Sequence, residues 1–239
     1  MPTDMYIPSS LVRPFDMKGG AFTTRRIIDK APFMGSVIIL MIIQLLLTFY
    51  VMKKLYTNER FHELMLSNWL YTLLLFITPL VIIIILAFVP MPMYAKLLLF
   101  TLFSMCFGVL LSISRRLLNP ELVKIALIVT IGVFVSMFVF GMVLAGFGYD
   151  VFWLGAILFV ALLIALISGI VMIFTQPEQK VVRTRAILIV ILFSLYVLYD
   201  TNQIIMRDYR NDYVTAAIDY YLDTINLFVF LMEAMSNSS

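Results

Sequence analysis

Long uncharged apolar runs, each of roughly 20 residues, recur along this sequence and constrain its fold more than any other feature. The clearest are Ala31–Met52, Ile125–Ala145 and Val151–Thr175, which contain no Asp, Glu, Lys or Arg. A run of this length crosses a hydrocarbon core of about 30 Å as a single α-helix. Backbone groups in lipid must be hydrogen-bonded internally, and these runs are too long for the alternating strands of a barrel. The sequence therefore predicts an all-α polytopic membrane protein.

Composition excludes several other classes of protein. Hydrophobic residues make up 63% of the 239 residues and charged residues 13%, whereas soluble domains have roughly 45–50% apolar and about 25% charged residues. A soluble fold of this size still exposes much of its surface and could not hide so many apolar side chains. An ordinary cytosolic enzyme, a disordered chain, a collagen and a nucleic-acid-binding module are therefore excluded.

Charges, prolines and glycines set the boundaries of the expected helices. The uncharged run 64–95 is too long for one span, so we expect Pro90 and Pro92 to end its helix. Residues 1–30 form a polar tail without the apolar segment of a signal peptide. Residues 31–235 form one seven-helix domain. The expected helices cover approximately 31–52, 69–89, 97–114, 125–145, 151–175, 186–205 and 213–234.

The distribution of positive charge around the first helix predicts the orientation. The tail before this helix carries more lysine and arginine than the loop after it, and the more positive side usually faces the cytosol. Over the whole chain the two sides nearly balance, so the expected cytosolic N-terminus depends on the first helix alone. The residues compared are Arg13, Lys18, Arg25, Arg26 and Lys30 in the tail, and Lys53, Lys54 and Arg60 in the loop.

Three carboxylates lie within the last two apolar segments. Asp200 interrupts the sixth segment, and Asp219 and Asp223 lie in the seventh, four residues apart and therefore on one helix face. Inserting an ionisable side chain at the centre of a membrane helix costs roughly 2.5–3.5 kcal/mol of free energy, so the presence of each carboxylate calls for a physical explanation. If the two helices are antiparallel, a rise of about 1.5 Å per residue brings Asp200 and Asp223 to similar depth. The spacing thus predicts a facing carboxylate pair.

Such a pair has predictable chemistry. Two carboxyl groups in a dry site share a proton, because both cannot ionise cheaply. The pair can then sense pH and, once deprotonated, receive a cation. Ligand sets made only of oxygen favour hard ions such as Ca²⁺. Asn202 and Asn226 lie near the carboxylates in sequence, with Thr201 and Thr224, and could add neutral oxygens.

A plainer interpretation of the same residues stays open. Asp200 could be solvated near a helix end, accepting a hydrogen bond from Tyr199, and Asp219 could be an ordinary polar-face residue. The single histidine, His62, is expected to be solvated in a loop, and the single cysteine, Cys106, to be a packing residue. The sequence contains no phosphate-cradling glycine loop, catalytic triad or zinc-helix motif. It therefore predicts neither an enzyme nor a bound cofactor.

Two segments carry a resemblance to a known family. Residues 193–205 read FSLYVLYDTNQII, and residues 212–228 read DYVTAAIDYYLDTINLF. This paired pattern resembles the sixth and seventh helices of the transmembrane Bax inhibitor motif family, which includes Bax inhibitor, lifeguard and Golgi anti-apoptotic proteins. Weaker likenesses occur at 44–48 and at 150–152, the latter shortly before Gly155.

The resemblance implies a seven-helix fold with the last helix central. It implies a leak of Ca²⁺, with protons or other cations as further cargo, across the endoplasmic reticulum, the Golgi or other intracellular membranes. Asp200 and Asp223 match the family's di-aspartyl pH sensor, which here would hold Ca²⁺ transiently. The implied physiology is a lowering of stored Ca²⁺ and inhibition of apoptosis. Some members latch one aspartate with an arginine on the second helix, but residues 69–89 contain no basic side chain.

Other functions compete with a channel. Seven helices also suit a receptor, but Arg207-Asp208-Tyr209 is not the usual receptor triad, and one cysteine cannot form an extracellular disulfide. A retinal protein needs a lysine in its last helix, and residues 213–234 contain none. The remaining alternative is a non-conducting membrane scaffold. Its expected partners, besides the lipid bilayer, are apoptosis regulators or a second copy of the chain.

Overall fold

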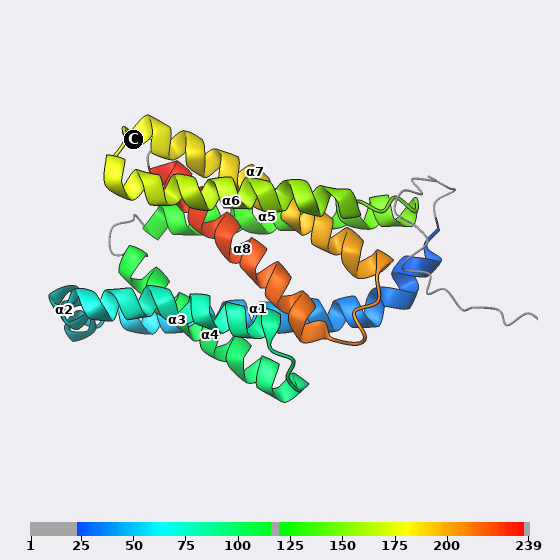
Figure 1. Cartoon of the computed structure of the whole chain (residues 1–239), viewed down its shortest axis with the longest axis horizontal. Coiled ribbons are helices and arrows are strands. Elements are labelled where there is room, and N and C mark those ends of the chain that lie inside the picture. Colours follow the sequence, from blue (N-terminus) through cyan, green and yellow to red (C-terminus); the bar gives the residue numbers. More distant parts are fainter. Residues whose placement is uncertain (1–22, 116–119, 237–239) are drawn as a thin grey trace, which may run out of the picture.

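The computed structural model describes residues 23–115 and 120–236, and this part of the chain is helical with short turns. Seven helices, all except α2, are long and apolar enough to cross a membrane. The all-α polytopic fold expected from the apolar runs is therefore confirmed. Most of the expected polar tail lies outside the described residues. The helices are α1 (Arg25–Tyr56), α2 (Glu59–Ser67), α3 (Trp69–Phe88), α4 (Met93–Arg115), α5 (Pro120–Gly146), α6 (Phe152–Thr175), α7 (Gln179–Met206) and α8 (Tyr213–Ser236) (Figure 1).

Helix α8 lies at the centre of the bundle. It contacts α1, α4, α5 and α7, and it runs obliquely between a group formed by α1, α3 and α4 and a group formed by α5, α6 and α7 (Figure 1). In its most apolar stretch 56% of the residues are buried, against 6% in α6. Ala216 and Ala217 let neighbouring helices approach, and Tyr220 and Tyr221 are fully buried. The last helix is therefore core, and α6 lies at the periphery.

Close approach between α5 and α7 depends on a glycine. A Cβ atom added to Gly141 would lie 2.6 Å from the Leu198 carbonyl oxygen and 2.8 Å from the Thr201 Cβ. The first of these is a backbone atom and cannot rotate away. Gly141 therefore fixes the distance between α5 and the part of α7 that contains Asp200.

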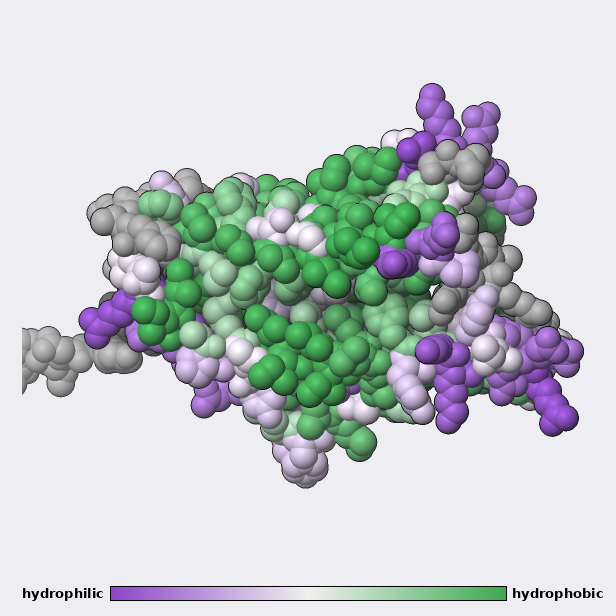
Figure 2. Space-filling model, turned by 180° about the vertical axis from the view of Figure 1, so that it is seen from behind, coloured by the Kyte–Doolittle hydropathy of each residue, from purple (hydrophilic) through white to green (hydrophobic). Residues whose placement is uncertain are grey.

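The outer surface of the bundle suits a lipid environment. Large apolar side chains are exposed along α3 and α6, among them Phe76, Ile84, Ile164 and Phe174. In Figure 2 a broad hydrophobic band crosses the middle of the molecule, and hydrophilic groups gather at its two ends. Exposed apolar area on this scale would aggregate in water. The chain is a multi-pass membrane protein with the lipid bilayer as its solvent.

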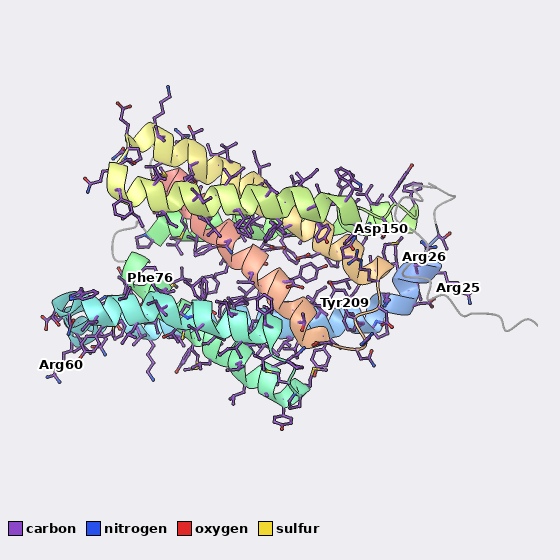
Figure 3. All side chains as sticks on the ribbon, in the orientation of Figure 1. Arg25, Arg26, Arg60, Phe76, Asp150 and Tyr209 are labelled. Atoms are coloured by element: carbon purple, nitrogen blue, oxygen red, sulfur yellow. The ribbon has the colours of Figure 1, made fainter. Side chains whose placement is uncertain are left out.

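The two ends of the bundle carry different loops. At one end the start of α1 meets later segments: Thr23 N donates to Gly146 O at 2.8 Å, and Lys30 Nζ donates to Arg207 O at 2.8 Å. We call this end the N-terminal face. The opposite end, the C-terminal face, carries α2, the turn 176–178 and the end of α8. In Figure 3, Arg26, Asp150 and Tyr209 mark the N-terminal face, and Arg60 marks the C-terminal face.

A short helix, α2, lies where a loop is expected between the first two spans. Asn58 caps it by accepting a hydrogen bond from Phe61 N at 3.2 Å, and Asn68 caps α3 by accepting from Leu70 N at 3.0 Å. The expectation that His62 is solvated is wrong, since His62 is 3% exposed. The amphipathic helix turns this ring inward, and its Nε2 lies 3.3 Å from the Tyr56 carbonyl oxygen.

Candidate ion site in the α7–α8 hairpin

A tight turn makes α7 and α8 an antiparallel hairpin. Arg210 and Asn211 adopt positive φ values of 49° and 62°, and Asp208 Oδ1 accepts a hydrogen bond from Arg210 N at 2.9 Å. Asp212 then begins α8, because its Oδ1 accepts from Thr215 N at 3.1 Å. Asp and Asn tolerate such turn geometry well. The local sequence therefore folds the two acidic helices back on each other.

The hairpin brings Asp200 and Asp223 together. The two carboxyl groups lie within side-chain hydrogen-bonding reach of each other. Asp200 is 9% exposed and Asp223 is 4% exposed. This is the facing arrangement expected from helix rise, and Asp200 is not a solvated residue at a helix end.

One oxygen of the carboxyl pair lacks a hydrogen-bond partner among the residues that the structure describes. Asp223 Oδ2 receives no hydrogen bond from the amide, hydroxyl or basic groups of the described residues. A carboxylate has no donor of its own, so two carboxyl groups can hydrogen-bond only if one carries a proton. The groups that can satisfy Asp223 are therefore a protonated Asp200, a water or a cation.

A third carboxyl group, Asp219, extends the pair toward the N-terminal face. Asp219 lies one turn before Asp223 on α8 and interacts electrostatically with both members of the pair. Tyr209, in the turn between the helices, interacts electrostatically with Asp219 and Asp200. Burial, together with the negative charges of Asp219 and Asp200, raises the pKa of Tyr209. We call Asp200, Asp219 and Asp223 the acid cluster.

Comparison with known proteins assigns the family. The family model described as "Inhibitor of apoptosis-promoting Bax1" matches residues 30–239, which include all of α2 to α8 and α1 from Lys30 onward. The chain belongs to this family. The resemblance noticed in the last two helices thus extends over nearly the whole protein.

Three relatives show how similarity within the Bax inhibitor family is distributed. The chain is 30% identical to Protein LIFEGUARD 4 of Arabidopsis thaliana over 167 residues, which cover 70% of this chain and 66% of the relative. It is 26% identical to Protein LIFEGUARD 2 of the same plant over 206 residues, covering 85% and 86%. It is 38% identical to the Golgi anti-apoptotic protein of vaccinia virus (strain Lister) over 86 residues, covering 36% of each chain.

The two asparagines expected to assist the acid cluster are engaged elsewhere in this Bax inhibitor family protein. Asn202 Nδ2 donates to Tyr149 O at 2.8 Å, and Asn202 Oδ1 accepts from Val151 N at 3.2 Å. Asn202 therefore ties α7 to the turn between α5 and α6. Asn226 Nδ2 donates to Leu222 O of its own helix at 2.7 Å. Neither amide donates a hydrogen bond to the acid cluster.

Gln203 is a polar neighbour that the sequence analysis did not single out. It lies one turn from Asp200 on α7 and is 2% exposed. Its Nε2 donates to Asp150 Oδ1 at 3.0 Å, while its Oε1 has no partner among the described residues. The run Thr-Asn-Gln directly after Asp200 is a polar signal within an apolar helix. Gln203 therefore links α7 to exposed Asp150 and keeps a buried acceptor that has no partner among the described residues.

A lysine near the acid cluster belongs to α4. Helix α3 lacks the basic residue with which some family members latch an aspartate, as the sequence indicates. Instead Lys96, in the first turn of α4, forms an ion pair with Asp212 and donates to Thr215 Oγ1 at 3.2 Å. Burial favours the neutral form of Asp212, but hydrogen bonds from Lys96 and Thr215 outweigh it and lower the pKa of Asp212. This lysine appeared in the sequence only as a break between two apolar runs.

The acid cluster is not arranged as a resident metal site. Within residues 23–115 and 120–236, no group of three or more His, Cys, Asp or Glu side chains is positioned to hold a metal ion. The cluster instead presents carboxyl oxygens in pairs or singly along α7 and α8. Such an arrangement fits a weakly held hard cation better than a structural one, because Ca²⁺ takes 6–8 oxygen ligands in stable sites.

Proposed function

We propose that this protein is a pH-sensitive, Ca²⁺-permeable leak channel whose gate is the facing carboxyl pair of Asp200 and Asp223. The single observation that carries the proposal is the pair itself. Two carboxyl groups, one on each arm of a hairpin, lie side by side at the centre of a membrane bundle. Ionisable groups at membrane depth are expensive to keep and usually mark an ion or proton route.

The proposed gate works through the charge of the pair. With one shared proton, the hydrogen bond holds α7 against α8 and no cation can pass between the carboxyl groups. Loss of that proton places two negative charges in contact in a medium of low dielectric, so the carboxyl groups repel. An incoming Ca²⁺ relieves the repulsion and is bound transiently. Higher pH on the side from which the pair is reached therefore favours flux.

The acidic groups of the N-terminal face support entry from that end. Asp212 interacts electrostatically with Asp219, which in turn interacts with Asp223. These groups form a series from the turn at 207–212 into the core, and a cation moving along it exchanges one carboxyl group for the next. Lys96, paired with Asp212, lies at the start of the series. Its positive charge lowers the local concentration of cations until the pair with Asp212 opens.

The cellular part of the proposal depends on the relatives. The Golgi anti-apoptotic protein of vaccinia virus is named for its compartment and effect, and the matching family is described as an inhibitor of apoptosis-promoting Bax1. We infer that this protein inhibits apoptosis by lowering stored Ca²⁺ in the endoplasmic reticulum or Golgi. The positive charges before and at the start of α1 favour a cytosolic N-terminal face, and with that orientation cytosolic pH would control the gate.

Reconstitution tests the channel directly. The purified protein in liposomes should pass Ca²⁺ with a rate that rises between pH 5 and pH 8. Asp200→Asn and Asp223→Asn should remove the pH dependence, because an amide neither ionises nor shares a carboxyl proton. Asp29→Asn makes the same charge change at an exposed position of α1 and should behave like the wild type. Flux that is independent of pH in the wild type refutes the gate.

A non-conducting scaffold is the second candidate. The names of the three relatives refer to apoptosis or protection, and none mentions an ion. In that case the carboxyl pair fixes the α7–α8 packing, and apoptosis regulators bind the outer surface. The two functions separate in one experiment. A scaffold shows no Ca²⁺ flux above empty liposomes, and Asp223→Asn retains its anti-apoptotic effect in cells.

A further inference from the structure

A cavity opens on the C-terminal face, far from the acid cluster. It is an open surface hollow of about 360 Å³ between the end of α6, the start of α7 and the end of α8. Arg185, on its wall, lies fifteen residues before Asp200 on the same helix, a separation of about 22 Å at 1.5 Å per residue. The cavity is therefore a separate site. Its walls combine the charged residues Arg185 and Glu233 with apolar residues, including Met172, Ile173 and Val182.

The guanidinium of Arg185 is held in a fixed orientation. Its Nε donates to Ser168 Oγ at 3.0 Å, and its Nη2 donates to Ala165 O at 3.1 Å. The ring of Phe230 lies beneath it, with the centroid 5.5 Å from Cζ. A Cβ atom on Gly169 would come within 2.7 Å of Nη2, so a larger residue there would make the guanidinium shift. The two hydrogen bonds use two of its five donors, and the side chain remains part of the cavity wall.

A negative charge shares the cavity. Glu233 lines it from α8 and interacts electrostatically with Arg185. Glu233 lies in the last turn of α8, and Arg185 lies within the first two turns of α7. Both charges are therefore at the end of the bundle, at the depth of lipid headgroups. Ile173, on the cavity wall, is 71% exposed on the lipid-facing side of α6, so the cavity opens sideways toward the bilayer.

We propose that this cavity binds the headgroup of a zwitterionic phospholipid of the phosphatidylethanolamine class, with its phosphate on Arg185 and its ammonium group on Glu233. Arginine presents donors in a fork that fits phosphate oxygens. An anionic lipid would bring a second negative charge to Glu233, and an apolar occupant would cover the charges of Arg185 and Glu233 without solvating them. A volume of about 360 Å³ suits a headgroup, and the acyl chains lie along the apolar side of α6.

Lipid retention by the whole protein tests this site. The protein is equilibrated in mixed micelles with phosphatidylethanolamine or phosphatidylglycerol, and the lipids retained are counted by native mass spectrometry. The wild type should retain phosphatidylethanolamine in preference to phosphatidylglycerol. Arg185→Gln should weaken phosphatidylethanolamine retention by about tenfold, since it removes a charge-assisted hydrogen bond. Glu233→Gln should abolish the preference between the two lipids, because the group that selects an amine is lost.

Matched variants keep the test decisive. Arg183→Gln and Glu178→Gln make the same charge changes at exposed positions beside the cavity and should retain lipid like the wild type. Val182→Trp leaves both charges in place and fills the cavity, so it should also lose the lipid if the site is the cavity. Equal retention of the two lipids by the wild type overturns the proposal. Normal lipid retention by Val182→Trp overturns it as well. This variant keeps the proposal testable if Arg185→Gln does not fold.

Discussion

The hydroxyl oxygens of Thr48 on α1 and Tyr221 on α8 lie 2.6 Å apart in the core of the bundle. Thr48 Oγ1 also lies 3.0 Å from the Ser104 carbonyl oxygen of α4. A threonine hydroxyl has one proton and two acceptor positions, so Tyr221 donates to Thr48 while Thr48 donates to a carbonyl oxygen. One hydroxyl group thus joins three helices at a point where water has no access.

Tyr221→Phe should lower the stability of the folded bundle without changing its architecture. The ring keeps its edge-to-face contacts with Phe100 and Phe103, and the hydrogen bond to Thr48 is lost. Hydrogen bonds between membrane helices contribute about 0.6 kcal/mol on average and about 1.7 kcal/mol at most. Unfolding in detergent, followed by circular dichroism, should show a loss in this range. Tyr50→Phe, at an exposed position of α1, should show none.

Two glycines of α5 should respond in opposite ways to alanine. Gly141→Ala forces α5 away from the Leu198 carbonyl, and overpacking of this kind costs about 1–3 kcal/mol. Gly132 has no atom within 4 Å of the Cβ position, so Gly132→Ala should be neutral or stabilising by up to about 1 kcal/mol through helix propensity. Thermal unfolding of both variants in one detergent measures the contrast. Equal effects would show that α5 and α7 do not approach as described.

The ion pair of Lys96 and Asp212 should contribute a pH-dependent part of the stability. The pKa of Asp212 is lower in the folded protein than its usual value of 3.8. The folded state therefore gains stability above about pH 4 and loses it as the pH falls toward the folded pKa. Lys96→Gln should flatten the stability curve below about pH 4.

The control for this curve is Lys124→Gln, at an exposed position of α5. It removes the same charge at a distance from Asp212 and should keep the slope of the wild type. Parallel curves for Lys96→Gln and the wild type would mean that the pair does not set the pKa of Asp212.

Asp219→Asn should lower the rate of Ca²⁺ flux, because the acidic series that leads from Asp212 to Asp223 loses one carboxyl group. Liposome flux of the variant and the wild type at one pH measures the difference. An unchanged rate would show that Asp219 is an ordinary polar-face residue, the interpretation that the sequence left open.

The features readable from the sequence are those that depend on one helix at a time. Uncharged runs locate seven spans because lipid leaves the backbone no other solution. The meeting of Asp200 and Asp223 follows from helix rise, since both lie at comparable distances from the same turn. The positions of the helix ends are harder to predict from the sequence than the number of spans. Helix α1 begins at Arg25 and α7 at Gln179, before the expected 31 and 186, because a helix continues past the hydrocarbon into polar sequence.

Features that depend on which helices are neighbours could not be read from the spacing. Lys96 and Asp212 are separated by 116 residues, and no periodicity indicates that α4 begins beside the start of α8. His62 looked solvated because its sequence neighbours are charged, but the face of α2 on which it lies is determined by tertiary packing. Gln203 is recognisable as a polar residue within an apolar helix. Its partner Asp150 could not be predicted, because it lies in a turn between two other helices.

The carboxyl pair lies on two consecutive helices, and this has a consequence for biosynthesis. The ribosome releases α7 and α8 only after the other long helices, and the two arms of the hairpin reach the translocon together. An aspartate alone in lipid is costly, and sharing a proton with a second carboxyl group leaves one negative charge on the two groups in place of two. A nascent chain that stops between residues 205 and 223 carries Asp200 without that partner. An unfinished copy of the chain is therefore distinguished by one unpaired acid in its sixth transmembrane helix.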